Sequence, residues 1–162
     1  MKHKNLLLIG LIMLFSSLQA QTITNHALGL RLGDNGGVGT EISYQMKLSD
    51  GHRLEGDLGW ASRRDGAIMK LTGLYQWVRP FEGHLNYYYG AGAGLVQANN
   101  DNEDINGTNA FAAGILGLEY LFALPIQLAL DLRPELNFGK NNDALNLDLA
   151  LSIRYLFWII WI

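Results

Sequence analysis

The chain has 162 residues, which is enough for one domain with a core of its own. Its 15 acidic residues outnumber its 12 basic residues, and this balance argues against a nucleic-acid-binding protein. It contains no cysteine, so we expect neither a disulfide framework nor a lipid anchor attached to cysteine.

The first twenty residues, MKHKNLLLIGLIMLFSSLQA, have the three parts of a secretory signal peptide. Two lysines precede an apolar stretch over 6–15, which is too short to span a membrane comfortably, and a cleavage site follows at LQA. We therefore predict that 1–20 is a cleaved signal peptide. The mature chain would then carry ten basic and fifteen acidic residues. An uncleaved N-terminal anchor is the alternative.

After this segment the chain divides into eight short segments in which apolar and polar residues alternate, as they do in β-strands. Clusters of Gly, Asn and Asp separate the segments, and none shows helical periodicity over a useful length. The sequence therefore predicts an all-β, antiparallel, up-and-down meander with an even number of strands. The predicted strands are 27–33, 40–48, 53–62, 67–78, 85–96, 110–122, 126–138 and 145–157.

Each predicted strand has an apolar phase, free of charge, and an opposite phase that carries the charges. A soluble barrel turns its apolar phase inward, whereas an outer-membrane barrel turns that phase to lipid and keeps a polar lumen. Alternation alone does not distinguish the two arrangements. The charged phase contains Arg31, Glu41, Glu55, Asp57, Lys70, Glu119, Asp131, Arg133, Glu135, Asp148 and Arg154.

Glycine distinguishes the two arrangements, because the charged phase is also the glycine-rich phase. An exposed convex surface has no steric need for glycine, and each glycine weakens a strand. Long Arg and Glu side chains fit inside a narrow barrel only opposite small residues. We therefore predict that the charged phase lines a lumen and that the apolar phase faces lipid, with the soluble barrel as the alternative. The small residues of the charged phase are Gly29, Gly59, Gly90, Gly92, Gly94, Gly117 and Ala150.

The connections and the aromatic residues also fit a membrane barrel. The turns SDGH, RPFEGH and ALP are short, whereas the connection over 97–109 is long, as for periplasmic turns and outer loops. Aromatic side chains near strand ends would form the interfacial girdles of such a barrel. They are Tyr44, Trp60, Trp77, Tyr87, Tyr120, Tyr155 and Phe157.

The segments KLTGLYQW, YYYGAGAG, ILGLEYLF and LALDLRPELNF resemble the eight-stranded outer-membrane β-barrel domains of the OmpA/OmpX type. The resemblance covers essentially the whole mature chain and implies an eight-stranded antiparallel up-and-down transmembrane β-barrel over 21–157. It also implies insertion into a bacterial outer membrane by the barrel-assembly machinery, which recognises an aromatic residue at the end of the last strand. The matching assembly signal is Tyr155 and Phe157. An apolar tail, WIIWI over 158–162, follows and departs from the family pattern.

We expect the lumen charges to pair across the barrel, because an unpaired charge in a narrow interior is costly. The network would be either a gate, narrow pore or proton path, or a satisfied core that fixes strand register. Eight strands enclose little free space, which favours the core. The predicted network is Arg31, Glu55, Asp57, Lys70, Glu119, Asp131, Arg133, Glu135, Asp148 and Arg154.

Neither a metal, a cofactor nor a catalytic residue is expected. The acidic stretch over 97–109 begins like an EF-hand loop, but Ala113 stands where the bidentate Glu is needed, so a solvated surface loop is expected. His26, His52 and His84 fall at the predicted periplasmic ends of strands. None of them could activate a nucleophile at the outer leaflet, as a lipid A-modifying enzyme requires.

The sequence thus predicts a non-enzymatic outer-membrane protein that contacts membrane lipid and acts through its surface loops. Adhesion, interaction or envelope integrity would be its role, with a surface ligand at loop 97–109. A narrow small-solute pore is the alternative, and a lipid A-modifying enzyme is less favoured. Two local irregularities are expected: a bulge or splaying at Pro134, and apolar residues in the lumen phase at Ile68 and Leu74.

Overall fold

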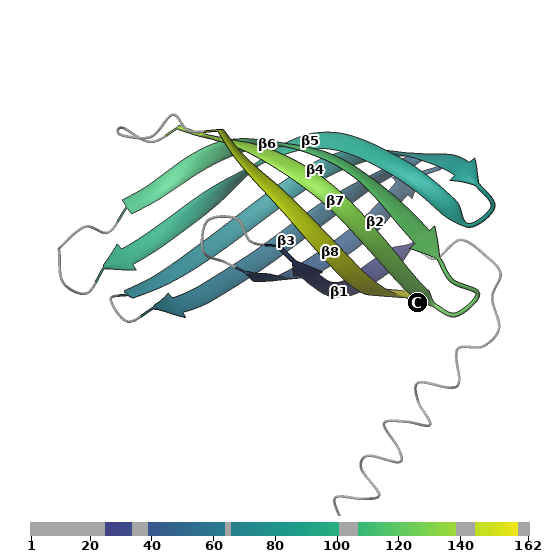
Figure 1. Ribbon diagram of the computed structural model, residues 1–162, viewed down its shortest axis with the longest axis horizontal. Coiled ribbons are helices and arrows are strands. Elements are labelled where there is room, and N and C mark those ends of the chain that lie inside the picture. The colour runs from purple at the N-terminus through teal and green to yellow at the C-terminus, as the bar shows by residue number, and fades with distance from the viewer. Residues whose placement is uncertain (1–24, 34–38, 64–65, 101–106, 139–144, 159–162) are drawn as a thin grey trace, which may run out of the picture.

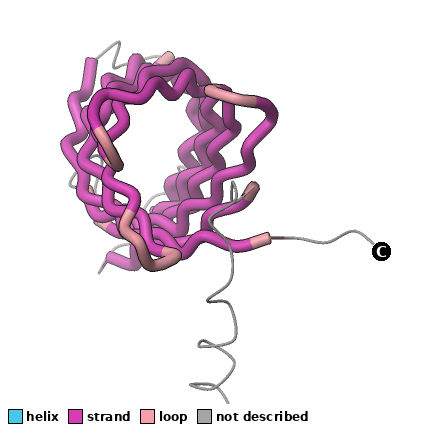
Figure 2. The backbone as a smooth tube through the Cα atoms, turned by 90° about the vertical axis from the view of Figure 1, so that its right-hand side faces the viewer, coloured by secondary structure: helices cyan, strands magenta, loops and turns pink. Residues whose placement is uncertain are grey.

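Eight antiparallel strands form one closed barrel in the computed structural model, with each strand paired to its neighbours in sequence and β1 paired to β8 (Figures 1 and 2). The predicted all-β, up-and-down barrel is therefore confirmed. The structure describes residues 25–33, 39–63, 66–100, 107–138 and 145–158. The strands are β1 His26–Leu32, β2 Thr40–Ser49, β3 His52–Arg63, β4 Gly66–Glu82, β5 Leu85–Asn100, β6 Gly107–Leu121, β7 Ile126–Asn137 and β8 Leu145–Phe157. No helix of the described residues is long and apolar enough to cross a membrane.

Three tight connections lie at one end of the barrel, on the right in Figure 1, together with the start of β1 and the end of β8. We call this the turn end and the opposite one the loop end. Gly51 in the β2–β3 turn has a φ of 77° and Gly83 in the β4–β5 turn a φ of 56°. Glycine adopts such left-handed conformations without steric cost, which allows each chain reversal to be short.

Both predicted boundaries of the long connection over 97–109 are wrong, because the flanking strands are longer than expected. β5 continues through Asn100 and β6 begins at Gly107, with Gln97 paired to Thr108 and Ala98 paired to Gly107. The polar residues of this stretch are typical of a loop. Strands that project beyond an apolar belt can also carry polar side chains in water, however, while their backbone hydrogen bonds continue. Residues 101–106 lie outside the described part of the chain.

The two phases of the strands face as predicted, with the charges inside. Leu147 and Leu149 on the outer surface are each 63% exposed, whereas Arg133 is 0% and Arg31 is 1% exposed. A barrel folded for water would bury the leucines and expose the arginines. The outer surface is therefore apolar all round the described strands, and the soluble alternative does not describe this fold.

Close approaches between strands explain why the lumen phase is rich in glycine. A Cβ added to Gly92 would lie 1.9 Å from the carbonyl oxygen of Gly73, and one added to Gly117 would lie 2.4 Å from Cζ of Tyr88. On the outer surface, a Cβ added to Gly56 would meet no atom within 4 Å. Glycine is thus required where backbone or bulky lumen side chains crowd the inner wall.

Pro134 interrupts the β6–β7 ladder without changing its register. Ala113 pairs with Glu135 and Leu116 pairs with Leu132, so the offset is the same on both sides of the gap. The predicted bulge is therefore wrong, because no residue is inserted; the ladder is interrupted locally instead. Gly114 makes room, since a Cβ there would lie 3.2 Å from Cγ of Pro134.

A small apolar cluster also lies inside the barrel, and it accounts for one of the two irregular residues of the fourth strand, Leu74. Leu74 is 2% exposed and packs with aromatic and small side chains of β5, β6 and β7. The lumen is therefore not polar throughout, because β4, β5, β6 and β7 place apolar side chains beside the charges. Its members are Leu74, Tyr88, Phe111, Ala113, Ile115 and Ala129.

Candidate functional site

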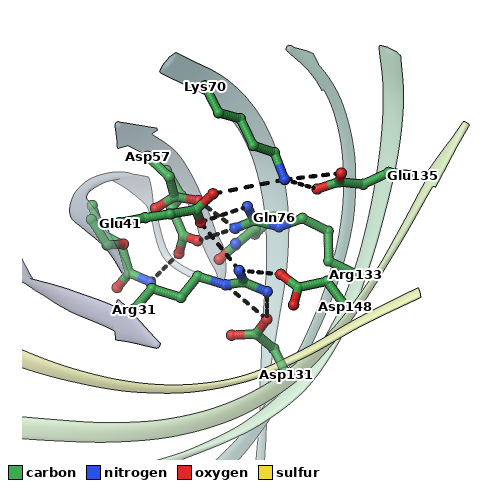
Figure 3. Close-up of polar contacts among 12 residues, drawn as sticks. Arg31, Glu41, Asp57, Lys70, Gln76, Asp131, Arg133, Glu135 and Asp148 are labelled. Atoms are coloured by element: carbon green, nitrogen blue, oxygen red, sulfur yellow. Dashed lines mark hydrogen bonds and ion pairs between the residues drawn. The ribbon is translucent and has the colours of Figure 1, made fainter. Parts of the chain in front are cut away.

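Charged side chains from opposite walls meet inside the barrel and form one candidate site, the lumen network (Figure 3). The strands deliver these side chains because successive residues alternate between the two faces of a sheet. Antiparallel register then sets their height along the barrel: Arg31 of β1 pairs with Glu41 of β2, and Arg133 of β7 with Asp148 of β8. The two buried arginines thus enter the lumen from the two strands that flank β8, each with a carboxylate on the paired strand.

Arg31 is surrounded by three carboxylates. Its Nη1 lies 3.1 Å from Oε2 of Glu41 and 2.5 Å from Oδ2 of Asp148. Its Nη2 lies 2.6 Å from Oδ1 of Asp131, which also accepts a hydrogen bond from Nε at 3.1 Å. A guanidinium presents its donors in a fixed fork, so these contacts hold β1, β2, β7 and β8 at one spacing.

Arg133 of β7 reaches across the lumen to β2 and β3 (Figure 3). Its Nη1 lies 3.1 Å from Oε2 of Glu41, and its Nη2 contacts Asp57 and lies 3.4 Å from Oε1 of Glu55. Glu41 therefore bridges Arg133 and Arg31 through a single oxygen. Because β3 and β7 are diametrically opposed in an eight-stranded ring, these ion pairs close the centre of the lumen.

Two further cations extend the network along the barrel. Nη2 of Arg154 lies 3.3 Å from Oε2 of Glu55, and its Nε donates to the hydroxyl of Ser43 at 3.0 Å. Lys70 donates to Glu135 across the lumen, with Nζ and Oε1 2.6 Å apart. All these side chains are buried, so each contact replaces hydration that the charges lose on folding.

A second group of polar side chains, the floor cluster, lies nearer the turn end. Nη1 of Arg53 lies 2.5 Å from Oε2 of Glu119, and its Nε donates to Oε1 of Gln76 at 2.5 Å. Gln127 donates to the same Glu119 oxygen at 2.6 Å, and Asn86 donates to Oε1 at 3.2 Å. Glu119 therefore accepts hydrogen bonds from three side chains, one of them charged.

Tyr88 joins the floor cluster to the lumen network. Its ring lies under the guanidinium of Arg53, with 4.6 Å between Cζ and the ring centroid, and its hydroxyl donates to Oδ2 of Asp131 at 3.2 Å. The ring is fully buried and occupies the space that Gly117 leaves open. A cation over the face of an aromatic ring is an attractive arrangement, and it is stronger when both groups are desolvated.

The ten residues predicted to line the lumen are all buried, and none is more than 3% exposed. Nine of them lie in the lumen network, and Glu119 lies in the floor cluster. Sequence reasoning placed Glu41 in the charged phase but left it out of the network, and it missed Arg53 and Tyr88 entirely. Arg53 shares the parity of Glu55, which could have revealed it, whereas Tyr88 was hidden among three consecutive tyrosines.

The buried charged residues of the described chain are five cations and seven carboxylates. The excess is negative, and it lies on the loop-end side, where Glu41, Asp57, Asp131, Glu135 and Asp148 gather around three cations. In the described ranges, no three His, Cys, Asp or Glu side chains are placed to hold a metal ion. The arrangement can tie opposite strands together and keep the lumen filled.

Aromatic side chains form a rim around the turn end, and three histidines belong to it. Nδ1 of His26 lies 2.7 Å from the hydroxyl of Tyr44, and Nδ1 of His52 lies 2.8 Å from that of Tyr75. His84 packs edge-on against another tyrosine ring. The structure thus places all three histidines at the turn end, and such amphipathic rings suit a membrane interface.

Tyr155 and Phe157, the predicted assembly signal, lie in the last turn-end residues of β8. Phe157 pairs with His26 in the closing seam, and the two rings stack with centroids 5.7 Å apart. Tyr155 pairs with Leu28 on one side and Ile126 on the other. Their role in assembly remains a prediction. The predicted signal peptide over 1–20 and the tail residues 159–162 lie outside the described residues.

No protein-family model matches the chain, and no curated protein matches it. Solved structures do match its fold. The crystal structure of Neisserial surface protein A (NspA) superposes with a TM-score of 0.57 at 14% sequence identity, covering 82% of this chain and 93% of that one. Ail, the attachment invasion locus protein of Yersinia pestis, superposes with a TM-score of 0.50 at 14% identity and the same coverages. The resemblance to small outer-membrane barrels is thus confirmed at the level of the fold.

Proposed function

We propose that this chain is an integral outer-membrane protein that acts without catalysis, through the segments at its loop end, in adhesion, interaction or envelope integrity. One observation carries the proposal: the described surface is apolar all round the barrel while its charges are buried inside. In a closed barrel the backbone N–H and C=O groups of every strand are paired with a neighbouring strand, so the barrel can lie in a membrane without unpaired backbone groups. Its apolar outer surface then suits contact with lipid. The turn end would face the periplasm and the loop end the exterior.

The comparisons support a role at the cell surface. One matched protein is called a surface protein, and the other an attachment invasion locus protein. At 14% sequence identity these matches show a similar fold only, so a similar role for this chain is a proposal. We place the ligand-binding segment at the β5–β6 connection, within 97–109, because β4, β5 and β6 are the longest described strands and extend farthest at the loop end.

The lumen supports a structural role and not a conducting one. Arg133 and Arg154 are at most 1% exposed and bridge carboxylates from facing walls. Moving a solute through this region would separate buried ion pairs at a large cost. We therefore favour a filled core that fixes strand register, and no observation favours a pore or a catalytic site.

Assembly and export complete the proposal. The segment 1–20 would direct export and be removed, the barrel-assembly machinery would recognise Tyr155 and Phe157, and Trp158, the first residue of the tail, would lie at the periplasmic interface. Trp158 supports this last point, because it is 47% exposed at the turn end and a tryptophan is favoured at a membrane surface.

Two measurements test the membrane assignment together. The chain, expressed with its N-terminal segment in a Gram-negative host, should fractionate with the outer membrane. Unheated and heated samples should migrate differently on a denaturing gel, because a closed barrel resists unfolding until it is boiled. Recovery in the soluble periplasmic fraction would contradict the assignment.

A loop variant tests the role at the surface. Replacing 101–106 with a short Gly-Ser linker should leave the heat-dependent gel shift unchanged and reduce the adhesion of expressing cells or their resistance to membrane-impermeant dyes. The matched control replaces the β4–β5 turn, Gly83 and His84, with Asn-Gly at the opposite end. Equal behaviour of both variants and the parent in adhesion and dye resistance would argue against action through this loop.

A further inference from the structure

One charged residue lies at the turn-end edge of the apolar outer surface. β4 continues through Glu82, so Arg79 belongs to this strand and shares the outward phase of Tyr75 and Trp77. Where the described strands keep their register, it is the only charged residue of that phase. A charge on a lipid-facing surface is costly unless its side chain reaches the membrane interface and finds a partner there. Arg79 therefore needs an anionic partner at this edge.

None of the described residues supplies that partner. Nη1 of Arg79 donates to the carbonyl oxygens of Val78, at 3.0 Å, and of Gly51, at 3.3 Å. Asp50, next to Gly51, pairs with Lys47 instead, with 2.6 Å between the carboxylate oxygen and Nζ. Nε and Nη2 of Arg79 make no hydrogen bond within the described chain, and they are not shut off from the surface. A guanidinium held on one edge can offer its remaining donors to two oxygens of a phosphate.

A groove of about 500 Å³ lies on the same outer surface, nearer the middle of the barrel. Its floor consists of small residues on adjacent strands, Gly56 of β3, Gly73 of β4 and Ala91 of β5. A Cβ added to Gly56 would meet no atom within 4 Å, so neighbouring side chains leave the floor uncovered. The walls are larger residues of the outer phase: Tyr44, Met46, Leu54 and Tyr75.

Two hydrogen bonds hold the tyrosine walls away from the floor of the groove. The hydroxyl of Tyr44 lies 2.7 Å from Nδ1 of His26, and that of Tyr75 lies 2.8 Å from Nδ1 of His52. Each histidine lies closer to the turn end than the tyrosine that it contacts. Both tyrosine rings therefore lean toward the turn end, and the groove is kept open by contacts within the barrel.

The distance between Arg79 and the groove matches one leaflet of a membrane. Gly73 precedes Arg79 by six residues on β4, which is about 20 Å along a strand. At a strand tilt of about 40° this corresponds to about 15 Å of depth, half of a hydrocarbon core of about 30 Å. With the turn end in the periplasm, Arg79 lies at the head-group level of the inner leaflet and the groove lies near the midplane. An acyl chain joined to a phosphate at Arg79 would thus reach the groove.

We propose that Arg79 and the groove together bind one phospholipid of the periplasmic leaflet. Its phosphate accepts hydrogen bonds from Nε and Nη2 of Arg79, and one acyl chain runs into the groove over Gly56 and Gly73. Trp77 and Tyr89 stack with centroids 5.5 Å apart and lie between the two parts of the site, at the level where aromatic rings favour the interface. The site rests on the proposed membrane placement of the barrel, and it adds a lipid held at one position.

The test uses the mature barrel folded in an uncharged detergent. Three probes are titrated: dioleoylphosphatidylglycerol, dioleoylglycerol, which has the chains without the phosphate, and inorganic phosphate, which has no chain. NMR follows the Nε–Hε resonance of Arg79 and the backbone amides of Gly56 and Gly73. We expect both sets of resonances to shift together and to saturate with the phospholipid alone. Equal saturation with either other probe would overturn the site, and so would phospholipid shifts that spare Arg79 or the two glycines.

Variants test the two parts of the site separately. Arg79→Gln should weaken phospholipid binding about tenfold in native mass spectrometry, the usual loss of a hydrogen bond to a charged group. Lys47→Gln is its matched control, because it removes a positive charge at the same end on the lumen side. Gly73→Leu fills the floor and should weaken binding as much, whereas Ala112→Leu adds similar bulk to the outer surface two strands away. Unchanged affinity in Arg79→Gln or in Gly73→Leu would overturn the proposal, as would equal losses in the controls.

The heat-dependent gel shift keeps this proposal distinct from the membrane assignment. Each variant must show the shift of the parent before its binding is compared. A parent barrel that shifts on heating but binds no phospholipid would overturn the lipid site and leave the membrane assignment intact. A chain recovered in the soluble periplasmic fraction would overturn both. If Arg79→Gln does not fold, the resonances of the parent decide the question.

Discussion

Arg133 shows how single residues stabilise this fold. It is 0% exposed, and its guanidinium meets Glu41, Glu55 and Asp57 from the opposite wall. A buried ion pair gains little over a well-packed apolar pair, because both ions lose their hydration. Removing one partner is different, since it leaves the others charged and buried. The network is therefore most sensitive to variants that delete a shared cation.

We predict that Arg133→Met destabilises the barrel by about 3–5 kcal/mol, because three buried carboxylates lose their common cation. Unfolding by urea in lipid vesicles, followed by tryptophan fluorescence, measures the loss. Lys47→Met is the control: Lys47 pairs with Asp50 at 2.6 Å, but that carboxylate is 94% exposed, and exposed pairs contribute little. Equal losses in the two variants would show that the lumen charges are not a coupled network.

A pair of glycines on adjacent strands provides a second test at this scale. Gly73 faces outward, and an added Cβ would reach its nearest atom, the carbonyl oxygen of Ala93, at 4.0 Å. Gly92 faces inward, and an added Cβ would lie 1.9 Å from the carbonyl oxygen of Gly73. Gly73→Ala should stabilise the barrel by about 0.5–1 kcal/mol through reduced chain entropy. Gly92→Ala should destabilise it by about 1–3 kcal/mol through overpacking, as measured by the same urea unfolding. The opposite order would mean that inner and outer walls are assigned incorrectly.

At the scale of elements, alternation predicted all eight strands, and glycine placed the charged phase inside. Arg133 and Asp148 could be assigned to the lumen by counting residues, because parity along a strand survives an error in its ends. The contacts of these residues could not be predicted in this way, because the distance between Arg133 and Asp57 depends on the stagger of β7 against β3. The extension of β5 to Asn100 was missed because polar residues carry the same local signal in a loop and in a strand above the membrane.

The last strand carries the element-scale prediction. Phe157→Ala should lower the fraction of heat-shifted barrel in cells several-fold, because the proposed assembly signal loses its terminal aromatic residue and keeps only Tyr155. Refolding of the same variant from urea into detergent should remain efficient, since Phe157 contributes one rim contact, with His26. Tyr120→Ala is the control, as Tyr120 also sits at the turn end and packs on Phe122. A refolding defect equal to the defect in cells would mean that Phe157 is needed only for stability.

At the scale of the whole molecule, the barrel has two different ends. At the turn end the connections are tight, aromatic side chains form a rim and the barrel mouth is open. At the loop end β4, β5 and β6 extend farthest, and the buried carboxylates outnumber the buried cations. The lumen network separates them, so a ligand at one end does not reach the other through the barrel. The proposed surface role therefore belongs to the loop end alone.

The absence of cysteine from the sequence makes this orientation directly measurable. Thr108→Cys places a thiol on the exposed loop-end part of β6, and Asp50→Cys places one in the β2–β3 turn. A membrane-impermeant maleimide added to intact cells should label the cysteine at 108 and leave the one at 50 unlabelled until the outer membrane is permeabilised. Both sites are exposed in the folded barrel, so access from outside decides the result. Labelling of the cysteine at 50 alone in intact cells would mean that the barrel has the opposite orientation, with its turn end at the cell exterior.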